Sequence, residues 1–121
     1  MAFDWREYLL LARFLQGQIG TKYSEESVNR SAVSRAYYAA YCHARNYAHA
    51  NEDFKPTRSF RDHELLRQHF QRTGRFDIAS ELEDLRQWRN ACDYEDDIAA
   101  DLVQQVQSAL QSAQEIIGKL K

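Results

Sequence analysis

Apolar residues recur at every third or fourth position along most of this chain, which is the spacing of amphipathic helices. The spacing predicts five helices, at about Phe3–Ile19, Glu25–His49, Phe60–Arg72, Asp77–Cys92 and Ile98–Leu120. No segment alternates apolar and polar residues as a strand would, and one Pro and four Gly leave few breaks. The pattern therefore predicts an all-α fold, an antiparallel bundle of about five helices, with residues 1–121 in one domain.

Local signals define several helix boundaries. Ser24, followed by Glu25 and Glu26, is typical of a helix start, because its side chain can accept a backbone N–H and the two acids favour the positive end of the helix dipole. Pro56 lies in a polar stretch, residues 51–59, that predicts a loop. Gly74 is expected to end the third helix as a C-terminal cap.

The composition is that of an ordinary globular protein, since 44% of the 121 residues are hydrophobic and 28% are charged. A net charge of −2 gives the whole chain no electrostatic attraction for nucleic acid. The charges are unevenly distributed, with six basic and two acidic residues between Lys55 and Arg75, and nine acidic residues between Asp77 and Asp101. Such a chain can either present a basic strip to RNA or pair its own faces.

The sequence shows no signal peptide and no apolar run near the ~18 residues that a membrane-spanning helix needs. Its two cysteines, Cys42 and Cys92, lie within predicted helices and show no paired spacing. We therefore expect buried free thiols in a cytoplasmic protein that has no membrane partner.

One charged residue interrupts the apolar face of the fourth predicted helix. Arg89 lies among Leu82, Leu85 and Cys92, where a guanidinium without partners would be costly to bury. Two interpretations remain open. Arg89 can pair internally, for instance with Asp93 one turn later, or it can bind an anion, because the guanidinium fork suits a phosphate.

The second predicted helix has a similar anomaly. Its inward stripe consists of small and apolar residues, yet Arg35, His43 and Asn46 fall within the same arc. The helix is also rich in tyrosine. Aromatic rings crowded on one helix can stack on bases, but they more often pack inside the fold.

No metal or cofactor site is expected. The four histidines pair at a spacing of six residues, His43 with His49 and His63 with His69, which does not place either pair on one helix face. The chain also lacks a Gly-rich phosphate loop and the Gly-x-Ser-x-Gly motif.

Two stretches of the sequence carry a family resemblance. In residues 31–41, SAVSRAYYAAY, Ser31, Arg35 and Tyr38 belong to a Ser, Arg and Ala-Tyr-Tyr pattern. In residues 85–94, LRQWRNACDY, an Arg-Asn pair is followed by a polar residue and a Tyr. Both stretches resemble signatures of the HEPN family. The order of helices also agrees, including a His (His63) near the start of the third, and the resemblance covers about residues 4–118.

The resemblance implies a helical bundle that commonly forms a homodimer, with the Arg-Asn motifs of two protomers near the interface. Active members are metal-independent ribonucleases, often toxins, that are encoded beside a small nucleotidyltransferase. By this resemblance Arg89 would hold the scissile phosphate of RNA and Asn90 would orient it. Tyr94 would correspond to a tyrosine that the partner nucleotidyltransferase modifies in some relatives.

The sequence departs from the active pattern in one respect. No histidine follows His69, so the catalytic histidine that comes after the Arg-Asn pair is absent. Asp93 occupies that region, and its ordinary pKa near ~4 makes it a poor general acid at neutral pH. His43, on the second helix, is the alternative source of an imidazole.

Three functions follow from these observations. The first is a HEPN-like module that is the partner of a minimal nucleotidyltransferase in a toxin–antitoxin-type system, with weak or lost catalysis. The second is a metal-independent RNA-cleaving toxin with a modified Arg-Asn motif. The third is a non-catalytic helical protein for dimerisation or scaffolding, in which the polar positions are only structural.

Overall fold

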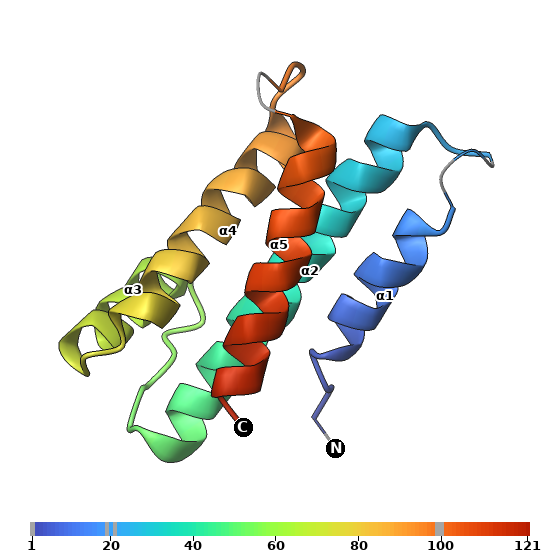
Figure 1. Cartoon of the computed structure of the whole chain (residues 1–121). Coiled ribbons are helices and arrows are strands. Elements are labelled where there is room, and N and C mark those ends of the chain that lie inside the picture. Colours follow the sequence, from blue (N-terminus) through green and yellow to red (C-terminus); the bar gives the residue numbers. More distant parts are fainter. Residues whose placement is uncertain (1, 19, 21, 99–100) are drawn as a thin grey trace.

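A computed structural model describes residues 2–18, 20, 22–98 and 101–121, and it confirms the all-α fold (Figure 1). The described residues form five helices: α1 Glu7–Gln16, α2 Glu25–Asn51, α3 Asp62–Arg72, α4 Phe76–Tyr94 and α5 Leu102–Lys119. In Figure 1, α1, α2, α4 and α5 run alternately up and down, with both termini at the same end. α3 is a short helix beside the lower half of α4.

α2 is the central helix of the bundle, because it packs against α1, α4 and α5. Its sequence explains how it fits there. Six of its alanines are completely buried, and a methyl group is the smallest side chain that still fills space between helices. Larger residues of the neighbouring helices, such as Phe70, Leu85 and Ile116, complete the core around them. The six alanines are Ala32, Ala36, Ala39, Ala40, Ala44 and Ala48.

The predicted caps are present in the structure. The Ser24 hydroxyl accepts a hydrogen bond from the backbone N–H of Ser27 at 3.1 Å, which starts α2. α3 ends at Arg72, and Gly74 in the turn that follows has a φ of +83°, after which the Arg75 N–H donates to the carbonyl of Phe70 at 2.7 Å. This positive φ favours glycine, since a Cβ would strain the backbone there.

Several helix ends differ from the prediction. α1 begins at Glu7 and not at Phe3, because the Asp4 carboxylate accepts the backbone N–H of Arg6 and holds residues 4–6 in a turn. α5 begins at Leu102 and not near Ile98, because the Asp101 side chain caps it. The predicted end of the first helix, residue 19, and residues 99–100 lie outside the described residues.

The observed ends of the three middle helices also differ from the predicted ends. α2 continues to Asn51, which shortens the predicted loop at its start. α3 begins at Asp62 and not at Phe60, because the Asp62 carboxylate binds back to the preceding loop. α4 extends to Tyr94, so that its last turn carries part of the second sequence motif.

The cysteine prediction is confirmed. Cys42 and Cys92 are free and buried, and burial raises the pKa of each thiol to about 11, which keeps both protonated and unreactive. Among the described residues, no helix is both long enough and apolar enough to cross a membrane.

Candidate functional site

The guanidinium of Arg89 lies inside a cage of tyrosine rings. Its central carbon is 5.2 Å from the ring centroids of both Tyr37 and Tyr38, which α2 supplies, and 5.8 Å from that of Tyr94. Only 8% of Arg89 is exposed. The negative faces of the rings stabilise a cation at these distances, which explains how α4 can carry an arginine on its inward face.

The polar contacts of Arg89 are few and long. Its Nη1 lies 3.4 Å from the Tyr94 hydroxyl and 3.8 Å from a carboxylate oxygen of Asp93, while its buried Nε has no hydrogen-bond partner among the described residues. The internal pairing with Asp93 is therefore present, but it is weak. A buried guanidinium normally fills its five donors, so Arg89 retains capacity for an anionic ligand.

A short polar chain connects the two sequence motifs. The Ser34 hydroxyl donates to Asp93 at 3.2 Å, and Arg35 donates to the same hydroxyl at 3.4 Å. Arg35 is half-buried, with its guanidinium 4.8 Å from the ring of Tyr8. The serine that connects α2 to α4 is thus Ser34. Ser31, which the motif suggested, is exposed and lines a separate apolar hollow beside α1.

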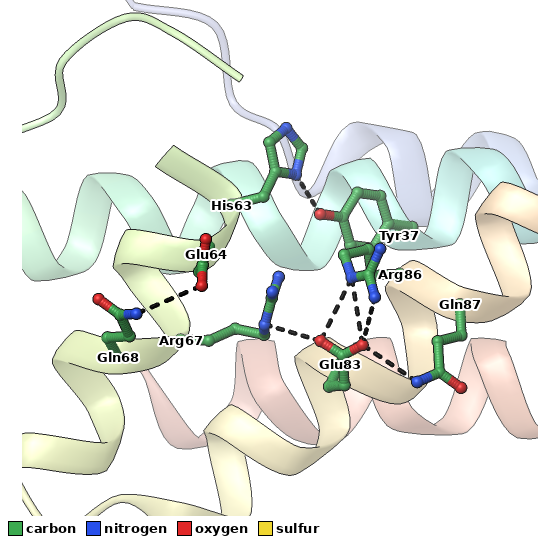
Figure 2. A network of polar contacts seen from close by, with 8 residues as sticks. All are labelled: Tyr37, His63, Glu64, Arg67, Gln68, Glu83, Arg86 and Gln87. Atoms are coloured by element: carbon green, nitrogen blue, oxygen red, sulfur yellow. Dashed lines mark hydrogen bonds and ion pairs between the residues drawn. The ribbon is translucent and has the colours of Figure 1, made fainter. Parts of the chain in front are cut away.

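The structure brings a histidine that the sequence did not assign into this region. Nδ1 of His63 shares a hydrogen bond with the hydroxyl of Tyr37 (Figure 2). The imidazole also stacks on Tyr41, with ring centroids 4.0 Å apart and planes 6° from parallel. Burial, together with the positive charges of Arg89 and Arg67, lowers the pKa of His63 to about 4, so the imidazole is neutral at pH 7.

Two further arginines lie near Tyr37 and His63, and both pair with one carboxylate. Glu83 forms an ion pair with Arg67 of α3 at 2.8 Å and a second one with Arg86 of its own helix (Figure 2). The hydrogen bond from Arg86 is the largest cause that lowers the pKa of Glu83. Three arginines therefore lie near the Tyr37–His63 pair, and their charge is offset by the carboxylates of Glu83, Asp62, Glu64 and Asp93.

The other predicted residues have clear positions. Asn90 is half-buried beside Arg89. His43 binds elsewhere, because its Nε2 lies 2.6 Å from the carbonyl oxygen of Leu120 at the end of the chain. No hydrogen bond or ion pair joins His43 to Arg89 within the part of the chain that the structure describes. Asp93 and Tyr94 are exposed on the last turn of α4.

The sequence predicts only part of the contact between His63 and the two tyrosines Tyr37 and Tyr41. Tyr37 and Tyr41 are one helical turn apart and so share a face of α2, which offers a place for a planar side chain. Which residue of the following loop or helix would cover that face is set by the path of the loop. In the part of the chain that the structure describes, no three His, Cys, Asp or Glu side chains gather as a metal would require.

Comparison with known proteins adds no relative to this description. No model of a protein family matches the chain, and neither the curated proteins nor the solved structures give a match.

Proposed function

We propose that this chain is a HEPN-like module that acts as the partner of a minimal nucleotidyltransferase in a toxin–antitoxin-type system, and that Tyr94 is the residue the transferase modifies. The observation that carries the proposal is the pairing of an exposed hydroxyl with a buried cation. Tyr94 is 75% exposed, and its oxygen lies 3.4 Å from Nη1 of Arg89. An external enzyme can reach this hydroxyl, and Arg89 is in place to bind the phosphate it receives.

The proposed transfer of a nucleotide to Tyr94 forms one bond and breaks one bond. The Tyr94 oxygen attacks the α-phosphorus of a nucleoside triphosphate that the transferase holds, and an O–P bond forms. The bond between the α- and β-phosphates breaks, pyrophosphate leaves, and the phenolic proton passes to a base of the transferase or to water. Arg89 would stabilise the negative charge of the new phosphodiester, because a guanidinium and a phosphate form short charge-assisted hydrogen bonds.

α1 supplies a surface for a protein partner. Leu10 and Phe14 on this helix are 67% and 62% exposed, and Phe14 borders a mainly apolar hollow of about 350 Å³ together with Tyr23 and Val28. Exposed apolar residues that gather on one face mark interaction sites on soluble proteins. The face can receive the transferase or, as the resemblance implies, a second copy of the chain.

The modification is tested by incubating the purified chain with the nucleotidyltransferase encoded beside it, ATP and Mg²⁺, followed by intact-mass spectrometry. We expect a mass increase of one or more nucleotide monophosphates on the wild type and none on Tyr94→Phe. Tyr47→Phe is the matched control, since Tyr47 lies near the C-terminal end of α2, outside the α1 face and without a hydrogen bond or ring contact to Arg89 among the described residues. An equal loss in both variants, or modification at another residue, contradicts the assignment of Tyr94.

Light scattering separates the two uses of the α1 face. A mass of twice 14.2 kDa that falls to the monomer in Phe14→Glu indicates a homodimer through α1. A clean monomer that loses only the transferase complex in Phe14→Glu assigns the face to the transferase.

RNA cleavage is the second candidate, and the position of His63 favours it. The family motif requires a histidine near the arginine, and His63 comes from α3 to the same cluster of rings and cations. When the Nδ1–H of His63 donates a hydrogen bond to the Tyr37 oxygen, Nε2 carries a lone pair. With this lone pair His63 could act as the general base that takes the proton of an RNA 2′-hydroxyl. The arginines would neutralise the phosphate under attack.

This candidate is tested by mixing the chain with transfer RNA without metal. Cleavage to cyclic phosphate ends that is lost in Arg89→Ala and in His63→Gln supports it. Asp93→Asn and His43→Gln are the informative comparisons, because they remove the two groups that the sequence suggested. Full activity in His63→Gln would exclude His63 as the base.

A further inference from the structure

A polar hollow lies at the C-terminal end of α2, and neither function above uses it. It measures about 360 Å³ and is lined by the last turns of α2, the loop that follows, and the first residue of α3. The lining residues are Arg45, Asn46, His49, Pro56, Arg58 and Asp62. A hollow of this volume lies within the range of small-molecule sites.

Two arginines of this hollow have no carboxylate partner. No ion pair within the described residues involves Arg45 or Arg58, whereas Arg67, Arg86 and Arg89 each have one. The Nε of Arg45 donates to the Asn46 amide oxygen at 3.1 Å, the side chain also hydrogen-bonds with Tyr41, and its charge helps to lower the pKa of Asp62. Two guanidinium groups at one concave site, without a carboxylate bound to either, attract an anion.

The one acidic residue of the hollow is already occupied. Asp62 Oδ1 accepts hydrogen bonds from the backbone N–H of Thr57 at 2.9 Å and from its hydroxyl at 2.6 Å, and Oδ2 accepts the backbone N–H of Arg58 at 2.9 Å. Burial alone would raise the pKa of Asp62, but these bonds lower it. Asp62 therefore anchors the loop and stays ionised, and its oxygens are occupied by two backbone N–H groups and the Thr57 hydroxyl.

The anchored loop holds Arg58 in an unusual conformation. Its φ is +65°, in the left-handed region that costs a residue with a long side chain and favours glycine or asparagine. The hydrogen bond between its N–H and Asp62 maintains this conformation. The backbone of Arg58 is thus held at the edge of the hollow by local structure, although another residue type would fit this conformation better, while its side chain is exposed to solvent.

One more donor lies at the hollow, because the exposed amide of Asn46 can supply an N–H. The Nδ1–H of His49 donates to the carbonyl of Phe54 at 2.9 Å, so its Nε2 is an acceptor that suits a hydroxyl of the ligand and not the phosphate. The guanidinium of Arg45 is 5.8 Å from the ring of Tyr41, the same ring on which His63 stacks. The hollow therefore adjoins the cluster around His63.

We propose that this hollow binds the phosphate group of a nucleotide, through the paired forks of Arg45 and Arg58. Guanidinium groups bind phosphate oxygens in a bidentate manner, and the volume leaves room for the sugar and base beside the phosphate. The phosphate can come from a free mononucleotide or from the end of an RNA strand, because the same donors recognise both. The proposal does not depend on Tyr94 or on RNA cleavage.

The test is a titration of the whole ¹⁵N-labelled chain, followed by NMR, with three probes: inorganic phosphate, AMP, and a short RNA that carries a 5′-phosphate. We expect saturable shifts at the amides of Asn46, His49 and Arg58. Arg58→Asn removes the charge but suits the positive φ, so the chain stays folded, and binding weakens about tenfold or more. Arg45→Gln has the same effect.

Arg72→Gln is the matched control, because Arg72 is an exposed arginine at the other end of α3. Equal weakening by Arg72→Gln and Arg58→Asn would mean that only the general charge matters, and would overturn the proposal. So would the absence of shifts with all three probes. Tighter binding of AMP than of the RNA assigns the hollow to a free nucleotide, and the opposite order assigns it to a strand end.

Discussion

The imidazole of His63 lies parallel to the ring of Tyr41, with 4.0 Å between the ring centroids. This contact places a neutral histidine beside tyrosine rings and arginines, two of which pair with the Glu83 carboxylate. A neutral imidazole can act as a base or donate one hydrogen bond, but it does not add charge, so the positive potential at the site comes from the arginines alone.

The protonation of His63 makes a testable contribution to stability. Its pKa is lowered to about 4 in the folded chain from 6.5, so the unfolded chain binds the proton more readily. The contribution is complete above pH 6.5 and is lost as the pH falls toward 4. Because about half of the group is exposed, we expect roughly 1–2 kcal/mol. Urea unfolding at pH 7 and pH 4.5 should show a smaller difference for His63→Phe than for wild type.

The control for this experiment is His49→Gln, which removes an exposed histidine from another part of α2. It should leave the difference between the two pH values unchanged. If His63→Phe and wild type lose the same free energy of unfolding on acidification, the low pKa of His63 is wrong.

Replacement of Arg89 by Met should separate function from stability. The guanidinium is almost fully buried and has only long polar contacts, so the cost of its desolvation is poorly compensated. Methionine has a similar length and fills the tyrosine cage. We expect the free energy of unfolding to change by less than about 1 kcal/mol, while nucleotide transfer or RNA cleavage is lost. Chemical denaturation measures the first and the assays above the second.

A large destabilisation by Arg89→Met, of about 3 kcal/mol or more, would indicate that Arg89 is structural and would favour a scaffold protein. The same substitution at Arg72 shows what an exposed arginine contributes.

The carboxyl groups of Glu81 and Glu115 make the folded chain sensitive to alkaline pH. Burial and the hydrogen bond with Glu115 raise the pKa of Glu81 to about 7. The folded chain then holds a proton that the unfolded chain releases near 4.5, so the contribution to stability is complete below pH 4.5 and is lost as the pH rises through 7. Glu81→Gln removes this dependence and should stabilise the chain by ~1 kcal/mol at pH 8, after allowance for solvent screening.

Thermal unfolding at pH 5 and pH 8 tests this prediction. Asp84→Asn, an exposed acid on the same helix, should shift both melting temperatures alike. A stabilisation by Glu81→Gln that is equal at the two pH values would show that the shared proton has no effect.

The buried alanines of α2 should not tolerate larger side chains. Ala36 is completely buried, and Ala→Leu there has to displace the helices that pack on α2. We expect a loss of about 1–3 kcal/mol in the free energy of unfolding. Ala50→Leu, at an exposed position of the same helix, should change it by less than about 0.5 kcal/mol. Similar values for the two variants would contradict the tight packing of α2.

The helices and the burial of Arg89 could be predicted because both follow from local periodicity. Leu82 and Leu85 set the inward face of α4, and Arg89 falls one turn beyond Leu85 on that face. The helix starts at Glu7 and Leu102 were missed, because they depend on single capping carboxylates, Asp4 and Asp101, within sequences that are also compatible with helix.

The histidine of the site could not be predicted from the same rules. His43 lies on α2, six residues after Tyr37, and so faces a different direction, toward Leu120. His63 is brought to Tyr37 by the loop before α3, whose path depends on the bonds from Thr57 and Arg58 to Asp62. Contacts of this kind are tertiary, and a single sequence contains no direct sign of them.

The attachment of α3 has a consequence for the motions of the protein. α2 packs on three helices, whereas α3 packs chiefly on α4 and is otherwise held by the loop that Asp62 anchors, by the contacts of His63 with α2, and by the hydrogen bond of His69 with Glu52 at 3.0 Å. Amide protons of α3 should therefore exchange with solvent by local opening, well before those of α2. Opening of α3 would break the contacts of His63 with Tyr37 and Tyr41, whereas Arg89 and its tyrosine rings belong to α4 and α2. We therefore expect the imidazole half of the site to be more dynamic than the guanidinium half.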